Sequence, residues 1–253
     1  MPPFLVDLAV ALALLAGMLG SLEAGYRLGR RRASPKEHPN LATVQGAVLG
    51  LLGLLLAFAF SGATSRFIER QDVLVREANA LGTAALRAEL LPAEQAAAAR
   101  SALRDYAEDR VRLLEQAGSG DDPALLERLH EHHRRLWRAA SEGVRIHQWT
   151  AQSVLPPVNE VIDLLSMRDS LVSRHLPYPV VALLVACAAL SLATIGYAAS
   201  VFGRRQGFIA GALAVLIASA LWVTIDLDYG RRGLIRVNPQ PLLEVRDELR
   251  RMG

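Results

Sequence analysis

The run LLGLLLAFAFSGATSRF, residues 51–67, decides the fold of this chain because it leads directly from an apolar segment into a polar one. It continues an uncharged stretch that begins at Leu41 and ends at Ala63. A helix rises about 1.5 Å per residue, so about 20 apolar residues cross the roughly 30 Å hydrocarbon core of a bilayer. The stretch therefore predicts a membrane-spanning helix over 41–63.

Three other apolar stretches have a similar length. They are Phe4 to Leu22, Val180 to Phe202 and Phe208 to Ile225. Backbone polar groups in lipid must be satisfied within their own segment, so each stretch is predicted to be helical. Basic residues follow the first stretch and do not precede it, which favours a retained span over a cleaved signal peptide. The chain is thus expected to have four spans.

The segment between the second and third spans shows helical spacing of its apolar residues. Leu74, Ala78 and Leu81 recur at intervals of three or four, and no proline occurs before Pro92. We therefore expect the second span to continue beyond the membrane as one helix. The predicted fold class is an all-α integral membrane protein with a helical bundle inserted between spans two and three. The predicted regions are 1–63, 64–176, 177–229 and a tail, 230–253.

Proline and aspartate residues mark where the helices of this insert are expected to begin and end. Pro92 suits the first turn of a second helix, and Asp122 is a plausible N-cap for a third helix that has Pro123 at its first position. The third helix is expected to end before Pro156 and Pro157, after which a fourth helix follows. No segment of the insert alternates in the manner of a strand.

The short loops predict the orientation in the membrane. Short loops rich in arginine and lysine stay in the cytoplasm, whereas long segments cross largely regardless of charge. This rule predicts that the insert lies on the outer side, although arginines after the fourth span weaken the case. The loop residues are Arg27, Arg30, Arg31, Arg32, Lys36, Arg204 and Arg205, and those after span four are Arg231, Arg232 and Arg236.

The sequence offers little for catalysis or metal binding. HEHHRR, residues 130–135, lacks the HExxH spacing of a zinc helix, and Cys187 is the only cysteine. There is no phosphate-binding loop, no nucleophile elbow and no basic face with interleaved aromatic residues. We expect neither an enzyme nor a metal, cofactor or nucleic-acid site, and the histidines are expected on a solvated face.

Small residues are frequent in the spans, where helices associate through close backbone contact. In the first span Ala9, Ala13, Gly17, Ser21 and Gly25 recur at every fourth position. Ordinary packing within one subunit and packing between subunits both remain open for these stripes. The predicted helix-packing glycines are Gly17, Gly46, Gly50, Gly53, Gly207 and Gly211.

Three acidic residues lie near span ends, where an ionisable group is either functional or paired at the interface. Glu23 is expected to pair with Arg27, four residues later. Asp226 and Asp228 close the fourth span, and a structural pairing of Asp226 with Arg231 or Arg232 is as plausible as a functional role.

Three strings in the chain carry a resemblance to a known family. They are residues 51–92, LPPVNEVIDLLSMRDS at 155–170 and DLDYGRRGLIRV at 226–237. Together they resemble the bestrophin-like domain family of bacterial membrane proteins, from Glu23 to Val237. More distantly, residues 51–71 are similar to the second helix of bestrophins, which are pentameric anion channels with a narrow apolar neck.

This resemblance implies a homo-oligomeric anion channel in the bacterial inner membrane, with chloride among the permeant ions. Leu54, Phe58 and Ser61 would line the pore, and Arg66 and Arg70 would raise the anion concentration at its mouth. The alternative is a non-conducting, membrane-anchored helical scaffold or sensor. In that case the residues expected to form hydrogen bonds inside the bundle are Asn79, Arg87, Asn159, Asp163 and Arg168.

Overall fold

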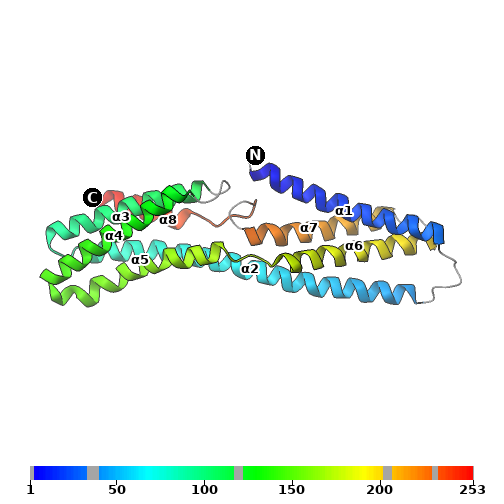
Figure 1. Cartoon of the computed structure of the whole chain (residues 1–253), viewed down its shortest axis with the longest axis horizontal. Coiled ribbons are helices and arrows are strands. Elements are labelled where there is room, and N and C mark those ends of the chain that lie inside the picture. The colour runs from blue at the N-terminus through cyan, green and yellow to red at the C-terminus, as the bar shows by residue number, and fades with distance from the viewer. Residues whose placement is uncertain (1–2, 33–39, 117–121, 202–206, 230–232, 253) are drawn as a thin grey trace. The chain divides into compact units, whose positions relative to one another are not determined.

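The protein is described by a computed structural model covering residues 3–32, 40–116, 122–201, 207–229 and 233–252. These residues form helices and connecting turns, with no strand among them (Figure 1). The α-helices are α1 (Pro3–Arg32), α2 (Leu41–Ala88), α3 (Ala93–Glu115), α4 (Pro123–Ile146), α5 (Ala151–Val172), α6 (Tyr178–Val201), α7 (Gly207–Tyr229) and α8 (Gln240–Arg251). A 3-10 helix, η1 (Gln148–Thr150), precedes α5.

The first of two compact units comprises residues 1–67 and 175–236 and is called the membrane unit. Among the described residues, four helices are long and apolar enough to cross a membrane, namely α1, α2, α6 and α7. Helix α1 packs against α6 and α7. The core includes Met18, Leu52, Leu192 and Leu221. The predicted fold class, with four membrane helices and a helical insert, is confirmed.

Helices α1 and α6 approach so closely that glycine is required at their contact. A Cβ on Gly25 would collide with the carbonyl of Ala193, and a Cβ on Gly196 would collide with the carbonyl of Leu22. Helices in lipid gain little from burying apolar side chains against one another, so direct backbone contact is a principal source of their attraction. Gly25 belongs to the stripe of small residues that the sequence showed, whereas Gly196 was not singled out.

The second unit comprises residues 68–174 and 237–253 and is called the helical unit. In it α3 packs against α4 and α8, and α4 packs against α5. Its core contains Leu81, Leu103, Leu129 and Val161. Helix α8 contributes Leu242, Val245 and Leu249 to this core. Residues 237–253 were expected only as a tail, yet they complete the apolar core of the helical unit.

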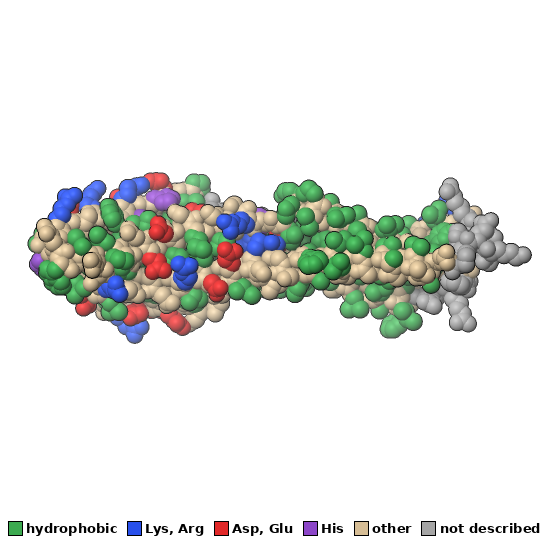
Figure 2. All heavy atoms as spheres, turned by 90° about the horizontal axis from the view of Figure 1, so that it is seen from below, with side chains coloured by type: hydrophobic (Ala, Val, Ile, Leu, Met, Phe, Trp, Pro, Cys, Tyr) green, Lys and Arg blue, Asp and Glu red, His purple; other side chains and the backbone are tan. Residues whose placement is uncertain are grey.

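The surfaces of the two units differ in composition. On the face drawn in Figure 2, Asp, Glu, Lys, Arg and His side chains gather over the helical unit. Hydrophobic side chains predominate over the membrane unit on the same face. This is the distribution expected where one unit presents its surface to lipid and the other to water.

Two local predictions are confirmed by the helix boundaries. Helix α2 runs without interruption through Ala88, beyond the apolar stretch that ends at Ala63. Helix α4 begins after Asp122, whose carboxylate accepts a hydrogen bond from the Ala124 amide at 3.0 Å. A capping carboxylate of this kind satisfies one of the free amides of the first turn.

The expected break at Pro156 and Pro157 is wrong, because both prolines lie inside α5. Pro157 has no amide hydrogen, so the carbonyl of Ser153 loses its usual helical donor. That carbonyl instead accepts a hydrogen bond from Nη1 of Arg87 at 2.9 Å. An arginine from α2 thus supplies a donor that proline removes, and the helix continues.

Candidate functional site

The three predicted pore residues lie on one exposed face of α2. Leu54 and Phe58 are 55% and 69% exposed, and Ser61 is also exposed. Spacings of four and three residues place these side chains above one another on a helix. Ala59 and Ala63 are buried on another face. The structure therefore brings the three residues together on an uncharged surface that the other described residues leave uncovered.

The six predicted helix-packing glycines are not packed against other described residues of the chain. A Cβ added to any of them would meet no described atom within 4 Å. This differs from Gly25 and Gly196, where backbone atoms of a neighbouring helix leave no room. Three of the open glycines, Gly46, Gly50 and Gly53, are on α2 and are exposed. Packing of these glycines between copies of the chain remains a prediction.

A partly buried ion pair joins α2 to the end of α7. Nε of Arg66 lies 2.8 Å from Oδ1 of Asp228, whose side chain is only 3% exposed. The other carboxylate oxygen accepts the amide hydrogen of Leu176 at 2.8 Å, and Nδ1 of His175 lies 3.6 Å from it. Arg66 was expected to attract anions at a pore mouth. Here it is paired with Asp228, while its Nη2 is buried without a hydrogen-bond partner among the described residues.

The other two acidic residues near span ends also have local partners. Glu23 receives a hydrogen bond from Nε of Arg27 at 2.8 Å, as the spacing of four residues predicted. The carboxylate of Asp226 accepts the amides of Leu234 and Ile235 at 3.1 and 2.9 Å. Asp226 therefore holds the backbone that follows α7. The alternative partners considered for it, Arg231 and Arg232, lie outside the described residues.

Arg70, the second residue assigned to a pore mouth, binds the end of α5. Its Nη2 donates to the carbonyl of Arg174 at 2.9 Å, and its Nε donates to that of Leu171 at 3.5 Å. The last carbonyls of a helix lack internal donors, and a positive charge there is favourable. In this structure Arg70 caps a helix of the helical unit.

The helical unit contains a buried polar cluster that sequence reasoning missed. The carboxylate of Glu77 is fully buried and binds Nε and Nη2 of Arg110 at 2.7 and 2.6 Å. The Tyr106 hydroxyl donates to the same carboxylate at 2.6 Å. Burial and the adjacent Glu77 raise the pKa of Tyr106 well above its usual range. The available signal was the position of Glu77 in the apolar stripe between Leu74 and Leu81.

The histidine-rich segment adds to this cluster instead of forming a solvated face throughout. His133 is buried and stacks on Tyr106 with ring centroids 4.7 Å apart. Burial lowers the pKa of His133 to about 4, which keeps its ring neutral. Nε2 of His132 lies 3.1 Å from the carboxylate of Asp109, and only His130 is exposed. In the described part of the chain, no group of three potential ligands could hold a metal ion.

The hydrogen-bonding residues expected inside the bundle are only partly correct. Arg87 binds the Ser153 carbonyl, and Nη1 of Arg168 lies 2.6 Å from Oδ1 of Asp169. The expectation is wrong for Asn79, Asn159 and Asp163, which are exposed. Their polarity places them on outward faces of α2 and α5, while the buried charged groups of the helical unit include Glu77, Asp109, Arg110 and Arg168.

These features define a helical membrane protein in which one long helix, α2, carries an uncharged exposed face and also contributes Arg66 and Glu77 to ion pairs. Residues 11–242 match the family model of the bestrophin-like domain. The chain therefore belongs to the bestrophin-like family. A comparison with curated protein sequences found no match.

Two solved structures of a bacterial bestrophin homologue from Klebsiella pneumoniae, each carrying one substitution, have a similar fold. The first has a TM-score of 0.68 at 17% sequence identity, and the match covers 97% of this chain and 98% of the chain in that structure. The second has a TM-score of 0.64 at 15% identity and covers 97% and 96%, respectively. At these identities the likeness shows a shared fold.

Proposed function

We propose that this protein is a homo-oligomeric anion channel of the bacterial inner membrane, with α2 lining its pore. The observation that carries the proposal is the exposed face formed by Leu54, Phe58 and Ser61 on an uncharged span. Membership in the bestrophin-like family supports it. A pentamer, chloride as a permeant ion and a periplasmic helical unit belong to the same proposal.

The chemistry of the α2 face suits an anion. A ring of phenylalanine side chains forms an apolar constriction that can close by dewetting, and weakly hydrated ions cross such a constriction at the lowest cost. The edge of each aromatic ring carries partial positive charge, which favours an anion over a cation. Ser61 lies about one turn further along and offers a hydroxyl donor to an ion that leaves the aromatic ring.

Close approach between copies is supported by the unfilled glycines of α2. Gly46, Gly50 and Gly53 meet nothing within 4 Å in this chain, so a neighbouring helix could contact their backbone directly. Small residues are enriched where helices meet in lipid. The same helix thus has a face suited to a pore and small residues suited to a subunit interface.

A non-conducting scaffold or sensor is the second candidate. It is favoured by the local pairing of Glu23, Asp226 and Asp228, each of which has a structural partner near a span end. Under this proposal the α2 face would be covered by a protein partner or by lipid, and the helical unit would carry the activity.

Chloride flux into liposomes separates the two candidates. We would compare the purified protein with Phe58→Ala and use Phe60→Ala as the matched control. Both phenylalanines are exposed on α2, at 69% and 45%, but a spacing of two residues places them on different faces. A channel predicts flux above that of empty liposomes that changes with Phe58→Ala and little with Phe60→Ala. Absence of flux would favour the scaffold, whereas flux that changes equally in both variants would contradict the placement of Phe58 in the pore.

The number of subunits is tested separately by native mass spectrometry of the detergent-solubilised protein. The channel proposal expects a closed ring, with five copies if the arrangement follows bestrophins. A monomer under conditions that preserve flux would contradict the pore proposed along α2.

A further inference from the structure

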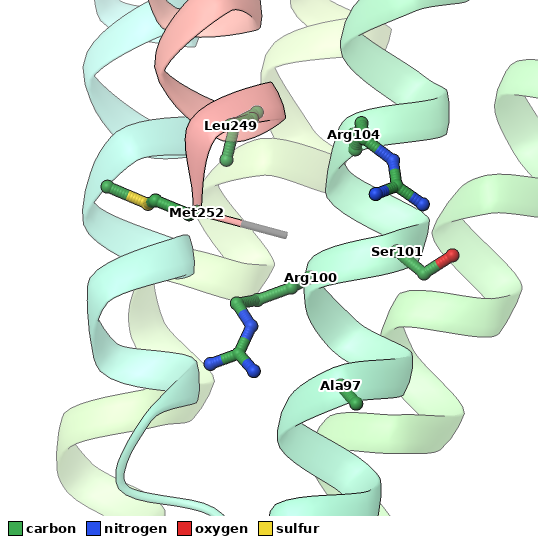
Figure 3. Close-up of a pocket in the computed structure, with 6 residues that line it drawn as sticks. All are labelled: Ala97, Arg100, Ser101, Arg104, Leu249 and Met252. Carbon is green, nitrogen blue, oxygen red and sulfur yellow. The ribbon is translucent and has the colours of Figure 1, made fainter.

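A pocket of about 220 Å³ lies in the helical unit between α3 and the last turn of α8. Figure 3 shows Ala97, Arg100, Ser101 and Arg104 along α3, with Leu249 and Met252 projecting from the end of α8. Leu249 is buried in the core of the unit, and Met252 packs against that core. The pocket thus combines an apolar wall with two guanidinium groups.

The two arginines of this pocket differ from most others in the helical unit. Arg100 and Arg104 are partly buried, yet neither has an ion pair or a side-chain hydrogen bond among the described residues. The nearby carboxylates of α3 are engaged elsewhere: Asp105 binds Arg135 at 3.0 Å, and Glu108 binds Arg250 at 3.0 Å. No carboxylate of the described chain therefore balances the charge of the pocket.

The two unpaired guanidinium groups are four residues apart on α3, and their mutual repulsion destabilises that helix. Residues four apart are neighbours on a helix surface, and like charges in that arrangement repel. Partial burial strengthens the repulsion because it removes part of the solvent screening. A bound anion would reverse the sign of this interaction and satisfy guanidinium donors that the chain leaves free.

We propose that this pocket binds a small soluble organic anion, with a phosphate or carboxylate group between Arg100 and Arg104 and a short apolar part against Leu249 and Met252. Guanidinium groups match planar or tetrahedral oxyanions through paired hydrogen bonds. The volume admits a ligand of several heavy atoms, well beyond a single water molecule. A soluble ligand fits better than a lipid because α3 and α8 are outside the four candidate spans.

Isothermal titration calorimetry of the whole chain, in detergent and a phosphate-free buffer, tests this site. The probe is phenyl phosphate, compared with inorganic phosphate and phenol. We expect saturable binding of phenyl phosphate, weaker binding of inorganic phosphate and none of phenol. Arg100→Gln and Arg104→Gln should each weaken phenyl phosphate binding by about tenfold or more, since each removes a charge-assisted hydrogen bond.

Arg138→Gln is the matched control, because Arg138 is an exposed arginine of α4 outside the pocket. It should leave binding unchanged, and Leu249→Ser should bring the affinity for phenyl phosphate close to that for inorganic phosphate. The site would be refuted by the absence of saturable binding, or by equal binding in the protein and in the double variant R100Q/R104Q. Displacement of the probe by vesicles containing phosphatidic acid, but not by soluble phosphate, would overturn its assignment to a soluble anion.

Discussion

Helices pack through different contacts in the membrane unit and in the helical unit. In the membrane unit, α1 and α6 meet through glycines whose missing side chains let backbones touch. In the helical unit, leucine, alanine and valine fill the interior around a buried ion pair. Lipid tails are as apolar as a leucine side chain, so burying leucine gains little there, whereas in water the same burial is the main driving force.

The comparison also concerns charge. In the helical unit, the ion pair between Glu77 and Arg110 lies inside the core. Both oxygens of the Glu77 carboxylate accept hydrogen bonds from Arg110, and one also accepts a hydrogen bond from the Tyr106 hydroxyl. The ion pair of the membrane unit, Arg66 and Asp228, lies at the end of a span and also fixes a backbone amide. In both units a charge removed from water has a partner of opposite sign, which limits the desolvation cost.

The strongest test of the buried pair is Arg110→Ala, which leaves the carboxylate of Glu77 buried without its cation. We expect the free energy of unfolding of the helical unit to fall by about 3–5 kcal/mol. Denaturant unfolding followed by the fluorescence of Trp137 and Trp149 measures it. The double variant E77L/R110M should recover most of the loss. A single variant within about 1 kcal/mol of the parent would show that the pair contributes little.

The pair at the end of α7 should have a smaller effect because Arg66 is partly exposed. Asp228→Asn removes the charge that balances Arg66 and weakens its hydrogen bond, for an expected loss of about 1.5–3 kcal/mol in the membrane unit. If α2 lines an anion path, the unpaired Arg66 should also increase the ratio of chloride to potassium permeability, measured from reversal potentials. Asp72→Asn, at an exposed position of α2, is the control.

Backbone contact in the membrane unit is tested by Gly196→Ala. The added methyl group would collide with the Leu22 carbonyl, so we expect a loss of about 1–3 kcal/mol and a lower unfolding temperature in detergent. Gly211→Ala, where the methyl group meets nothing, should be neutral or stabilising by up to about 1 kcal/mol. The same loss in both variants would contradict the distinction drawn between these glycines.

The smallest expected effect is the pH dependence that His133 gives to the helical unit. Its pKa is lowered to about 4 in the folded protein, below the ordinary value of 6.5, so the unfolded chain binds more protons between these values. Stability should therefore fall as pH decreases from about 6.5 towards 4, by about 1–2 kcal/mol between pH 7 and pH 5. His133→Gln should reduce the slope of unfolding free energy against pH over this window. An unchanged slope would assign the dependence to other groups.

The sequence allowed the four spans, the unbroken α2 and the Asp122 cap to be predicted, because each depends on neighbouring residues along the chain. The Glu23–Arg27 pair belongs to the same class, since its partners are one helical turn apart. Arg66 and Asp228 are 162 residues apart, and nothing in either local pattern identifies the other as its partner.

Two other features of the structure depend on contacts that local patterns do not encode. Helix α8 was not foreseen because its short amphipathic pattern gains stability only against the apolar core that it completes. The exposed face of α2 was predicted as a set of residues, but the pore role proposed for it requires contacts between copies of the chain.

The two prolines of α5 have a consequence for how this helix opens. Residues 156 and 157 have no amide hydrogens, so the first turns of α5 lack two of the internal bonds that normally resist fraying. The Arg87 side chain replaces one of them from a different helix. Local opening at the start of α5 is therefore linked to α2, and hydrogen exchange near Val158 should report on the state of Arg87 as much as on α5 itself.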